Sequence, residues 1–515
     1  MNGAESLLQT LINQGVEVCF TNPGTSEMHM VAAIGKTQGM RSILCLFEGV
    51  CSGAADGYGR MAGKPACTLL HLGPGLSNAS ANIHNARKGN SPMLNLVGDH
   101  ATYHKKYDAP LTSDITGLAQ PVSHWVKTTD SAANLPRDAA DAVAEARVKP
   151  GRISTLIVPA DCAWDESVEP VAARPAPEVP VASEAAISEA AALLKNGKNT
   201  LLLLGNQALT ETGMALADQI AQVTGARILC DTFFTRMPRG EGRAQVERLQ
   251  YFAEMGVEQI QDCEQLIMVG TKAPVAFFAY PGKPSEFYQP EARLHTLATV
   301  GENAEDALAR LAQETGAADT APRLAQRLPT TAGSDELSPR TLAMSFAHFL
   351  PTDAIVVDEG ATAGGGCYPA TANAEPHDWL TLTGGSIGYG LPTAIGAAVA
   401  CPDRKVIALH GDGGAMYTIQ ALWTMARENL DICVVILANR KYQILQIELA
   451  RVGAQTMNKK TLDMLDIGNP DLDFVALAQG MGITAHKAST IEQFNESFET
   501  AMRTQGPCLI EAVLP

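Results

Sequence analysis

The chain has few cysteines for its length, and none of them lies in a paired motif. Its 515 residues include 11 Cys, which are scattered and form no C-x-x-C pair. Disulfide scaffolds and zinc sites need closely spaced cysteines, so the sequence predicts neither. We expect a protein that works in a reducing compartment.

Basic residues and long apolar runs are also scarce. Lys and Arg number 38 against 55 Asp and Glu, which gives a formal net charge of -17. Nucleic acids and anionic membranes need a basic face, so we expect neither as a main partner. No segment reaches about 18 uninterrupted apolar residues, and the first residues lack the pattern of a signal peptide. These absences predict a cytoplasmic location.

Short apolar runs and frequent glycines dominate what is present. Runs such as 200–204, 265–269, 405–409 and 432–437 alternate with amphipathic stretches, and the chain contains 45 Gly. Near-continuous apolar strands separated by helices are typical of parallel sheets that are covered on both faces. The sequence therefore predicts an α/β fold built from doubly wound parallel sheets.

Two linker-like stretches divide this pattern into three parts. Residues 168–183 are rich in Pro and Ala, and residues 321–339 are rich in Thr, Ser, Pro and charged residues. The predicted domains are therefore 1–166, 184–323 and 337–515, each near the usual domain size.

The sharpest motif is the glycine-rich turn from Gly411 to Gly414. It follows a predicted strand and precedes a helical stretch at 417–427. Such a turn presents backbone N–H groups to an anion such as a diphosphate. Asp412 and Asn439, at the ends of neighbouring strands, can offer oxygen ligands to one hard cation, which suits Mg²⁺.

This motif resembles the diphosphate-binding motif of thiamine diphosphate enzymes. The whole chain, least clearly in its middle part, resembles the superfamily of benzoylformate decarboxylase, pyruvate decarboxylase and acetohydroxyacid synthase. Supporting segments are Phe47-Glu48-Gly49 with the helix after it, and residues 384–388. The resemblance implies a pyrimidine-binding first domain, a central domain and a diphosphate-binding third domain.

The resemblance also implies roles for individual residues. Glu48 matches the residue that hydrogen-bonds the pyrimidine ring of the cofactor and activates it, and His71 and Thr25 match active-site positions of benzoylformate decarboxylase. The expected Mg²⁺ ligands are Asp412, Asn439 and the carbonyl of Lys441. The expected cofactor-binding residues are Gly385, Ile387, Gly411, Gly413, Gly414, Thr362 and Asn78.

The leading hypothesis is non-oxidative decarboxylation of a 2-oxo acid whose side chain fits a pocket formed partly by Phe277 and Phe278. Two alternatives stay open: a carboligase like acetolactate synthase, and a non-catalytic homologue. The segment 107–111 lacks the Phe-Gln pair of synthases, and the segment 272–279 lacks the second histidine of benzoylformate decarboxylase. The sequence does not decide whether His84 or His100 reaches the pocket.

Family architecture also implies a homodimer or homotetramer with active sites between subunits. The partners that we expect are thus a small 2-oxo acid and further copies of the chain.

Overall fold

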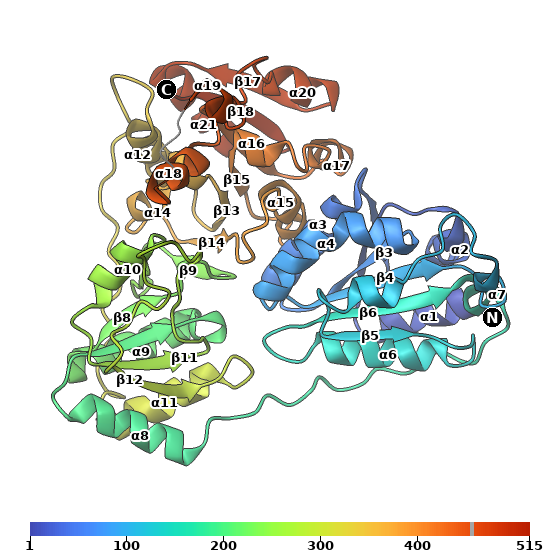
Figure 1. Cartoon of the computed structure of the whole chain (residues 1–515), viewed down its shortest axis with the longest axis horizontal. Coiled ribbons are helices and arrows are strands. Elements are labelled where there is room, and N and C mark those ends of the chain that lie inside the picture. Colours follow the sequence, from blue (N-terminus) through green and yellow to red (C-terminus); the bar gives the residue numbers. More distant parts are fainter. Residues whose placement is uncertain (454–457) are drawn as a thin grey trace.

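The computed structural model describes residues 1–453 and 458–515, which form three parallel-sheet units (Figure 1). In the first unit the strand order is β2-β1-β3-β4-β6-β5, and all pairs are parallel. Its strands are β1 (Val18–Thr21), β2 (Arg41–Leu44), β3 (Ala66–Leu70), β4 (Met93–Asp99), β5 (Trp125–Thr128) and β6 (Ile153–Pro159). Its helices are α1 (Gly3–Asn13), α2 (Met28–Lys36), α3 (Glu48–Ala62), α4 (Leu72–Lys88), α5 (Ile115–Ala119), α6 (Leu135–Ala146) and α7 (Ala160–Trp164), with 3₁₀ turns η1 (Thr25–Glu27) and η2 (Lys105–Tyr107).

The second unit is a smaller parallel sheet with the order β10-β8-β7-β11-β12. Its strands are β7 (Thr200–Leu204), β8 (Arg227–Cys230), β10 (Glu247–Arg248), β11 (Gln265–Val269) and β12 (Arg293–Ala298). Its helices are α8 (Glu184–Lys195), α9 (Glu211–Thr224), α10 (Ala253–Ile260) and α11 (Ala304–Thr315), with the 3₁₀ turn η3 (Asn206–Ala208). The predicted runs at 200–204 and 265–269 are its fully buried central strands.

The third unit has the strand order β17-β18-β16-β15-β13-β14-β9. Its strands are β9 (Met237–Arg239), β13 (Ala354–Glu359), β14 (His377–Thr381), β15 (Val406–Gly411), β16 (Ile432–Ala438), β17 (Thr484–Ala488) and β18 (Cys508–Val513). Its helices are α12 (Pro339–Phe349), α13 (Ala361–Gly364), α14 (Cys367–Ala370), α15 (Gly390–Ala400), α16 (Asp412–Ala415), α17 (Ala421–Arg427), α18 (Gln443–Arg451), α19 (Lys459–Asp463), α20 (Phe474–Gly480) and α21 (Ile491–Arg503). The expected α/β class with three parallel sheets is confirmed.

One strand departs from the expected pattern. β9 comes from the chain between β8 and β10, yet it pairs antiparallel with β14 at the edge of the third sheet. Pro238 in its middle lacks an N–H group and is therefore tolerated only at such an edge. The central and third units are thus joined by hydrogen-bonded strands as well as by the linker.

The first and third units meet through a close helix crossing of α3 and α15. Added Cβ atoms at Gly57 and Gly396 would lie 2.1 Å from the carbonyl oxygen of Thr393 and 1.9 Å from that of Ala54, so both positions require glycine. Beside this crossing, the buried Arg60 pairs with Asp56 at 2.8 Å. Among the described residues, no helix has both the length and the apolar character needed to cross a membrane.

Candidate functional site

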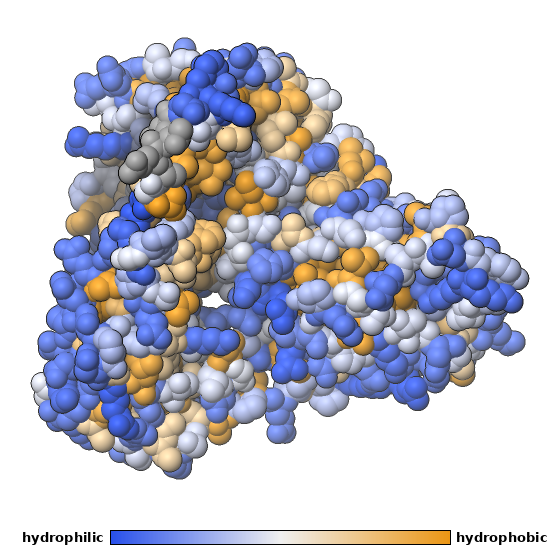
Figure 2. All heavy atoms as spheres, in the orientation of Figure 1, coloured by the Kyte–Doolittle hydropathy of each residue, from blue (hydrophilic) through white to orange (hydrophobic). Residues whose placement is uncertain are grey.

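The predicted metal and diphosphate residues meet at the carboxyl edge of the third sheet. Gly411 ends β15, Asp412 begins α16, and Asn439 follows β16. They line one cavity of about 1760 Å³. The same cavity is lined by all nine predicted third-domain residues, namely Thr362, Gly385, Ile387, Gly411, Asp412, Gly413, Gly414, Asn439 and Lys441. On the face in Figure 2, hydrophobic residues gather around the hollow between α18 and α16.

Backbone groups hold the carboxylate of Asp412 in this cavity. Its Oδ1 accepts from the N–H of Gly413 at 2.8 Å, and its Oδ2 accepts from the N–H of Arg440 at 2.6 Å. Burial raises the pKa of Asp412, while these backbone donors oppose the rise. A Cβ at Gly413 would lie 2.3 Å from a ring carbon of Tyr442, so only glycine fits beside the motif.

A glutamine that sequence reasoning missed ties two of the predicted residues together. Oε1 of Gln443 accepts from the hydroxyl of Thr362 at 3.2 Å and from Nδ2 of Asn439 at 3.0 Å. Because Nδ2 is bound in this way, the amide orientation of Asn439 is fixed and its oxygen is kept as an acceptor. Gln443 belongs to no sequence motif, so its contact with the site is visible only from its position at the start of α18.

The donor set fits Mg²⁺ bound together with a diphosphate. Within residues 1–453 and 458–515, no three His, Cys, Asp or Glu side chains are grouped for metal binding. At the glycine turn the cavity offers the carboxylate of Asp412, the amide oxygen of Asn439 and the backbone carbonyl of Lys441. Mg²⁺ prefers such a sparse set of protein oxygens when phosphate oxygens and water complete its octahedron.

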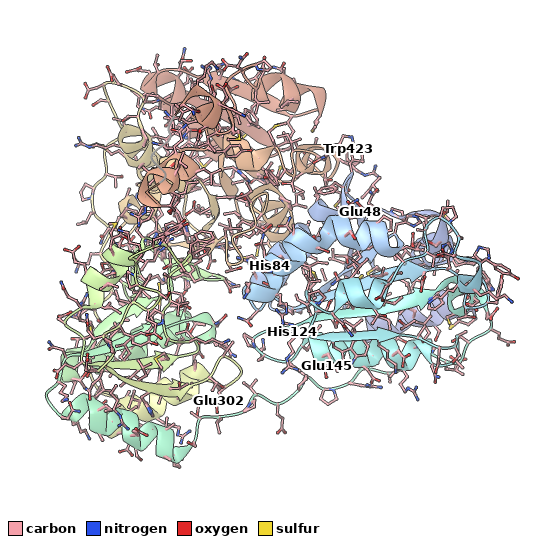
Figure 3. All side chains as sticks on the ribbon, viewed as in Figure 1. Glu48, His84, His124, Glu145, Glu302 and Trp423 are labelled. Atoms are coloured by element: carbon pink, nitrogen blue, oxygen red, sulfur yellow. The ribbon has the colours of Figure 1, made fainter. Side chains whose placement is uncertain are left out.

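Glu48, by contrast, lies at the carboxyl edge of the first sheet. It is the first residue of α3, it is buried, and its Oε2 accepts from Nδ2 of Asn78 at 2.9 Å (Figure 3). Asn78 thus contacts Glu48 in this chain. Neither residue is among those that line the third-domain cavity, and the same holds for His71 and Thr25.

His71 belongs to a side-chain network that sequence reasoning missed. Its Nδ1 lies 2.8 Å from Oε2 of the fully buried Glu27 and 3.2 Å from the hydroxyl of Ser26, which itself donates to Glu27 at 2.7 Å. A carboxylate partner fixes the tautomer with the proton on Nδ1, which leaves Nε2 for other chemistry. Thr25 begins η1 beside this network, and its side chain is exposed.

Two glycines make room for this network. A Cβ at Gly24 would lie 2.1 Å from Nδ1 of His71, and one at Gly98 would lie 1.8 Å from Oε1 of Glu27. The N–H of Gly24 also donates to Oε2 of Glu27 at 2.8 Å. The segment Asn22 to Glu27, which reads as a plain turn, is therefore shaped around the imidazole ring.

The two histidines that the sequence left open do not line the cavity. His84 lies on α4 (Figure 3). Its Nε2 lies 3.1 Å from the carbonyl oxygen of Gly384, and Asn85 next to it exchanges hydrogen bonds with the backbone of Ser386. These contacts let α4 hold the loop that carries Gly385 and Ile387. The ring of His100 packs against that of His104, with their centroids 5.4 Å apart.

A buried ion pair fixes the other end of that loop. Nε2 of His410 lies 3.0 Å from Oε2 of Glu359, and the two carboxylate oxygens accept from the N–H groups of Gly388 and Gly390. Burial alone lowers the pKa of His410, but the charge and hydrogen bond of Glu359 outweigh burial and raise it. The apolar surroundings of both residues hide this pair from sequence analysis.

Aromatic side chains form the wall beside the loop. Phe277 and Phe278 line the cavity, and a Cβ at Gly385 would lie 3.2 Å from a ring carbon of Phe277. Phe233 and Tyr251 pack on Phe277 with centroid distances of 5.3 and 5.4 Å. The cavity therefore combines a polar floor at Asp412 with an apolar wall.

Comparisons with known proteins agree with this geometry. Family models for the N-terminal and C-terminal TPP-binding domains of thiamine pyrophosphate enzymes match residues 1–125 and 364–512. The chain is 49% identical to the "Putative acetolactate synthase large subunit IlvX" of Mycobacterium tuberculosis, covering 100% of this chain and 99% of that protein. It is 28% identical to benzoylformate decarboxylase of Pseudomonas aeruginosa, covering 98% and 97% of the two chains.

A solved structure supports the fold. The chain superimposes on the 4-hydroxybenzoylformate decarboxylase of Rhodococcus jostii with a TM-score of 0.87 at 24% identity, covering 100% of this chain and 99% of the other. The sheets, the glycine turn and the full-length relatives of this chain all indicate the same family. The chain belongs to the thiamine diphosphate-dependent enzymes of the decarboxylase or acetolactate synthase type, whose cofactors are thiamine diphosphate and Mg²⁺.

Proposed function

We propose that this protein catalyses the non-oxidative decarboxylation of a 2-oxo acid. The observation that carries the proposal is His71, whose Nδ1 is held by Glu27 at 2.8 Å. Release of an aldehyde requires a proton at the carbon that has lost the carboxyl group, and an oriented imidazole can deliver it near neutral pH. Bound thiamine diphosphate supplies the carbon nucleophile that stores the electron pair of the broken bond.

The third-domain residues hold the cofactor in this proposal. Asp412, Asn439 and the carbonyl of Lys441 would hold Mg²⁺, and the glycine turn would receive the diphosphate. Ile387, the carbonyl of Gly385 and Thr362 would help to hold the rest of the cofactor. The apolar wall of Phe277 and Phe278 excludes water and receives the side chain of the substrate.

Glu48 moves a proton in this proposal. Its carboxyl group would hydrogen-bond a ring nitrogen of the aminopyrimidine, and its buried setting would exclude water from that bond. Asn78 donates to the second half of the same carboxylate and so orients it. Thr25 contacts the substrate carboxylate from the rim.

Because Glu48 and Asp412 do not share a cavity within one chain, we propose that two chains complete each active site. The first-domain edge around Glu48 carries exposed apolar side chains, including Leu46, Tyr107 and Leu118, which suits burial against another copy. A homodimer would then hold two equivalent sites, and two dimers can form a homotetramer.

Mixed dimers test this arrangement directly. Glu48→Gln and Asp412→Ala chains are each expected to be inactive alone. When they are co-expressed with different tags, one site of each mixed dimer combines two intact halves, so about a quarter of wild-type activity returns in a random mixture. A mixture that stays inactive, despite mixed dimers in the tag pull-down, would place the site within one chain.

A panel of 2-oxo acids tests the reaction. With thiamine diphosphate and Mg²⁺ present, we expect CO₂ and the matching aldehyde from at least one acid. The second candidate is acetolactate synthase-like carboligation, which the 49% identity to the M. tuberculosis protein favours. It predicts an acyloin or acetolactate-type product instead of aldehyde. A chain that binds the cofactor but acts on no acid, alone or with a second carbonyl, would match the non-catalytic homologue.

A further inference from the structure

The short edge strand β10 of the central sheet carries an arginine that faces the cavity and, within the described residues, forms no ion pair. Arg248 ends β10 at the carboxyl edge of the central sheet, it is half-buried, and it lines the same cavity as Asp412. Its Nε donates to the carbonyl oxygen of Thr232 at 3.0 Å. The guanidinium lies 4.5 Å from the ring centroid of Tyr368 and 5.9 Å from that of Phe233.

Within the described residues Arg248 has no direct ion-pair partner, although its charge opposes the rise that burial causes in the pKa of the nearby Asp358. In the part of the chain that the structure describes, no carboxylate lies within the 4.0 Å ion-pair distance of Arg248 or of the buried Arg239, whose guanidinium lies 3.4 Å from the ring centroid of Tyr368. The nearby Asp358 accepts instead from the N–H of Gly360 and from Nε1 of Trp379.

Other cavity arginines behave differently. Arg243 pairs with Glu211 at 2.9 Å, and Arg323 pairs with Asp218 at 2.7 Å. In a chain with a net charge of -17, acidic partners are plentiful, so two unpaired guanidinium groups on one aromatic ring are not explained by a shortage of acids. A partly desolvated cation without a direct ion-pair partner is costly, and a bound anion reduces that cost.

The aromatic wall connects Arg248 with the cofactor loop. Phe233 packs between the guanidinium of Arg248 and Phe277, whose ring centroid is 5.3 Å from that of Phe233, and Phe277 borders Gly385. A ligand that reacts beside Gly385 and extends along these rings reaches Arg248 with its far end. The route from Gly385 to Arg248 therefore runs along the apolar rings of Phe277 and Phe233 and ends at a charged group.

We propose that Arg248 binds a carboxylate at the distal end of the substrate, so that the preferred substrates are 2-oxo dicarboxylates with an apolar middle. This inference rests on the proposed function and names the substrate class of that site. Arg239 adds to the positive field behind Arg248. A planar guanidinium stacked on an aromatic ring is preorganised for bidentate binding of a carboxylate.

Paired substrates test the proposal on the holoenzyme. 2-Oxoadipate and 2-oxohexanoate share a chain length but differ in the distal carboxylate. We expect wild type to favour the diacid by about 10- to 100-fold in kcat/KM, since a charged hydrogen bond is worth about 1.5–3 kcal/mol. Arg248→Met should remove this preference mainly through KM, and Arg248→Lys should keep part of it. No preference in wild type, or an equal loss for both acids in Arg248→Met, would overturn the proposal.

A control and a binding measurement separate this inference from the proposed function. Arg323→Met removes a cavity arginine that is already paired, and should leave the substrate preference intact. Calorimetry with the unreactive acids adipate and hexanoate should show tighter adipate binding that is lost in Arg248→Met. If no 2-oxo acid is decarboxylated but adipate still binds more tightly than hexanoate, the proposed decarboxylase function is wrong and the anion site at Arg248 is supported. If 2-oxo acids are decarboxylated but neither assay distinguishes the diacid from the monoacid, only the anion site is wrong.

Discussion

The carboxyl edges of the first and third sheets follow similar parallel strands but carry different groups. At the third edge, glycines and backbone N–H groups around Asp412 line a large open cavity. At the first edge, Glu27, Ser26 and His71 bond one another in a compact network around a buried carboxylate. Under the proposed function, the difference indicates that backbone groups at the third sheet would hold the anionic ligand, whereas oriented side chains at the first sheet would move protons.

The largest effect is expected from a substitution at the first sheet, where Glu48 is proposed to move a proton. Glu48→Gln keeps the shape of the side chain but removes the titratable group, so kcat should fall by about 10²–10⁴-fold. Cofactor binding, measured by calorimetry, should stay near that of wild type. Glu17→Gln, at an exposed acid of the same domain, serves as the control. A Glu48→Gln enzyme with full activity would disprove the role of Glu48.

The second prediction concerns the third sheet, where Asp412 is proposed to hold the cofactor through Mg²⁺. Asp412→Ala removes a buried carboxylate that would face the bound Mg²⁺, which should cost about 2–5 kcal/mol of binding free energy. We expect loss of cofactor during gel filtration and recovery only at high Mg²⁺ and thiamine diphosphate concentrations. The exposed Asp403→Ala should retain cofactor as wild type does. Unchanged retention in Asp412→Ala would contradict the assignment.

A third, intermediate effect sharpens the comparison at Glu27. Glu27→Gln removes the charge that orients His71, and we expect a fall in kcat of about 10- to 100-fold, with a shifted pH profile, because a misplaced proton donor is less effective. Glu27→Asp should restore part of the profile, whereas Ser26→Ala should have a smaller effect. A loss of kcat with an unchanged pH profile would indicate a purely structural role.

The smallest effect concerns the central sheet. Burial raises the pKa of Asp231 from 3.8 to about 7, against the hydrogen bond from Thr271. The folded state therefore holds a proton that the unfolded state has lost, and the free energy of unfolding falls as pH rises from about 4 to 7. Asp231→Asn should flatten this trend and raise Tm at pH 8 by a few degrees. Asp319→Asn, at an exposed acid, serves as the control. If the free energy of unfolding falls with pH as steeply in Asp231→Asn as in Asp319→Asn, the prediction is wrong.

The sequence predicted the fold class and the third-domain site because both depend on local signals. Apolar runs identify the buried strands, and the glycine turn at 411–414 directly follows one of them. The predicted helix at 417–427 was less accurate, since α16 already begins at Asp412 and α17 begins only at Ala421. Gly414, within α16, lies against Glu359 and His410.

Contacts between distant segments could not be predicted in the same way. Glu27 contacts His71 because β1 and β3 are neighbours in the first sheet. Gln443 contacts Thr362 because the segments that follow β16 and β13 lie at the same edge of the third sheet. A pattern read along the chain does not register such pairs. The roles assigned to the site residues, the domain boundaries and the cytoplasmic location stay predictions.

The origin of β9 has a consequence for how the protein is made. Residues 237–239 leave the ribosome well before β14 exists, so the central unit must wait with one strand unpaired until the third sheet forms. Conversely, a third unit expressed by itself would leave the edge of β14 uncovered, which invites edge-to-edge association. Attempts to express the units separately should therefore carry 237–239 with the third unit, joined to it by a designed loop.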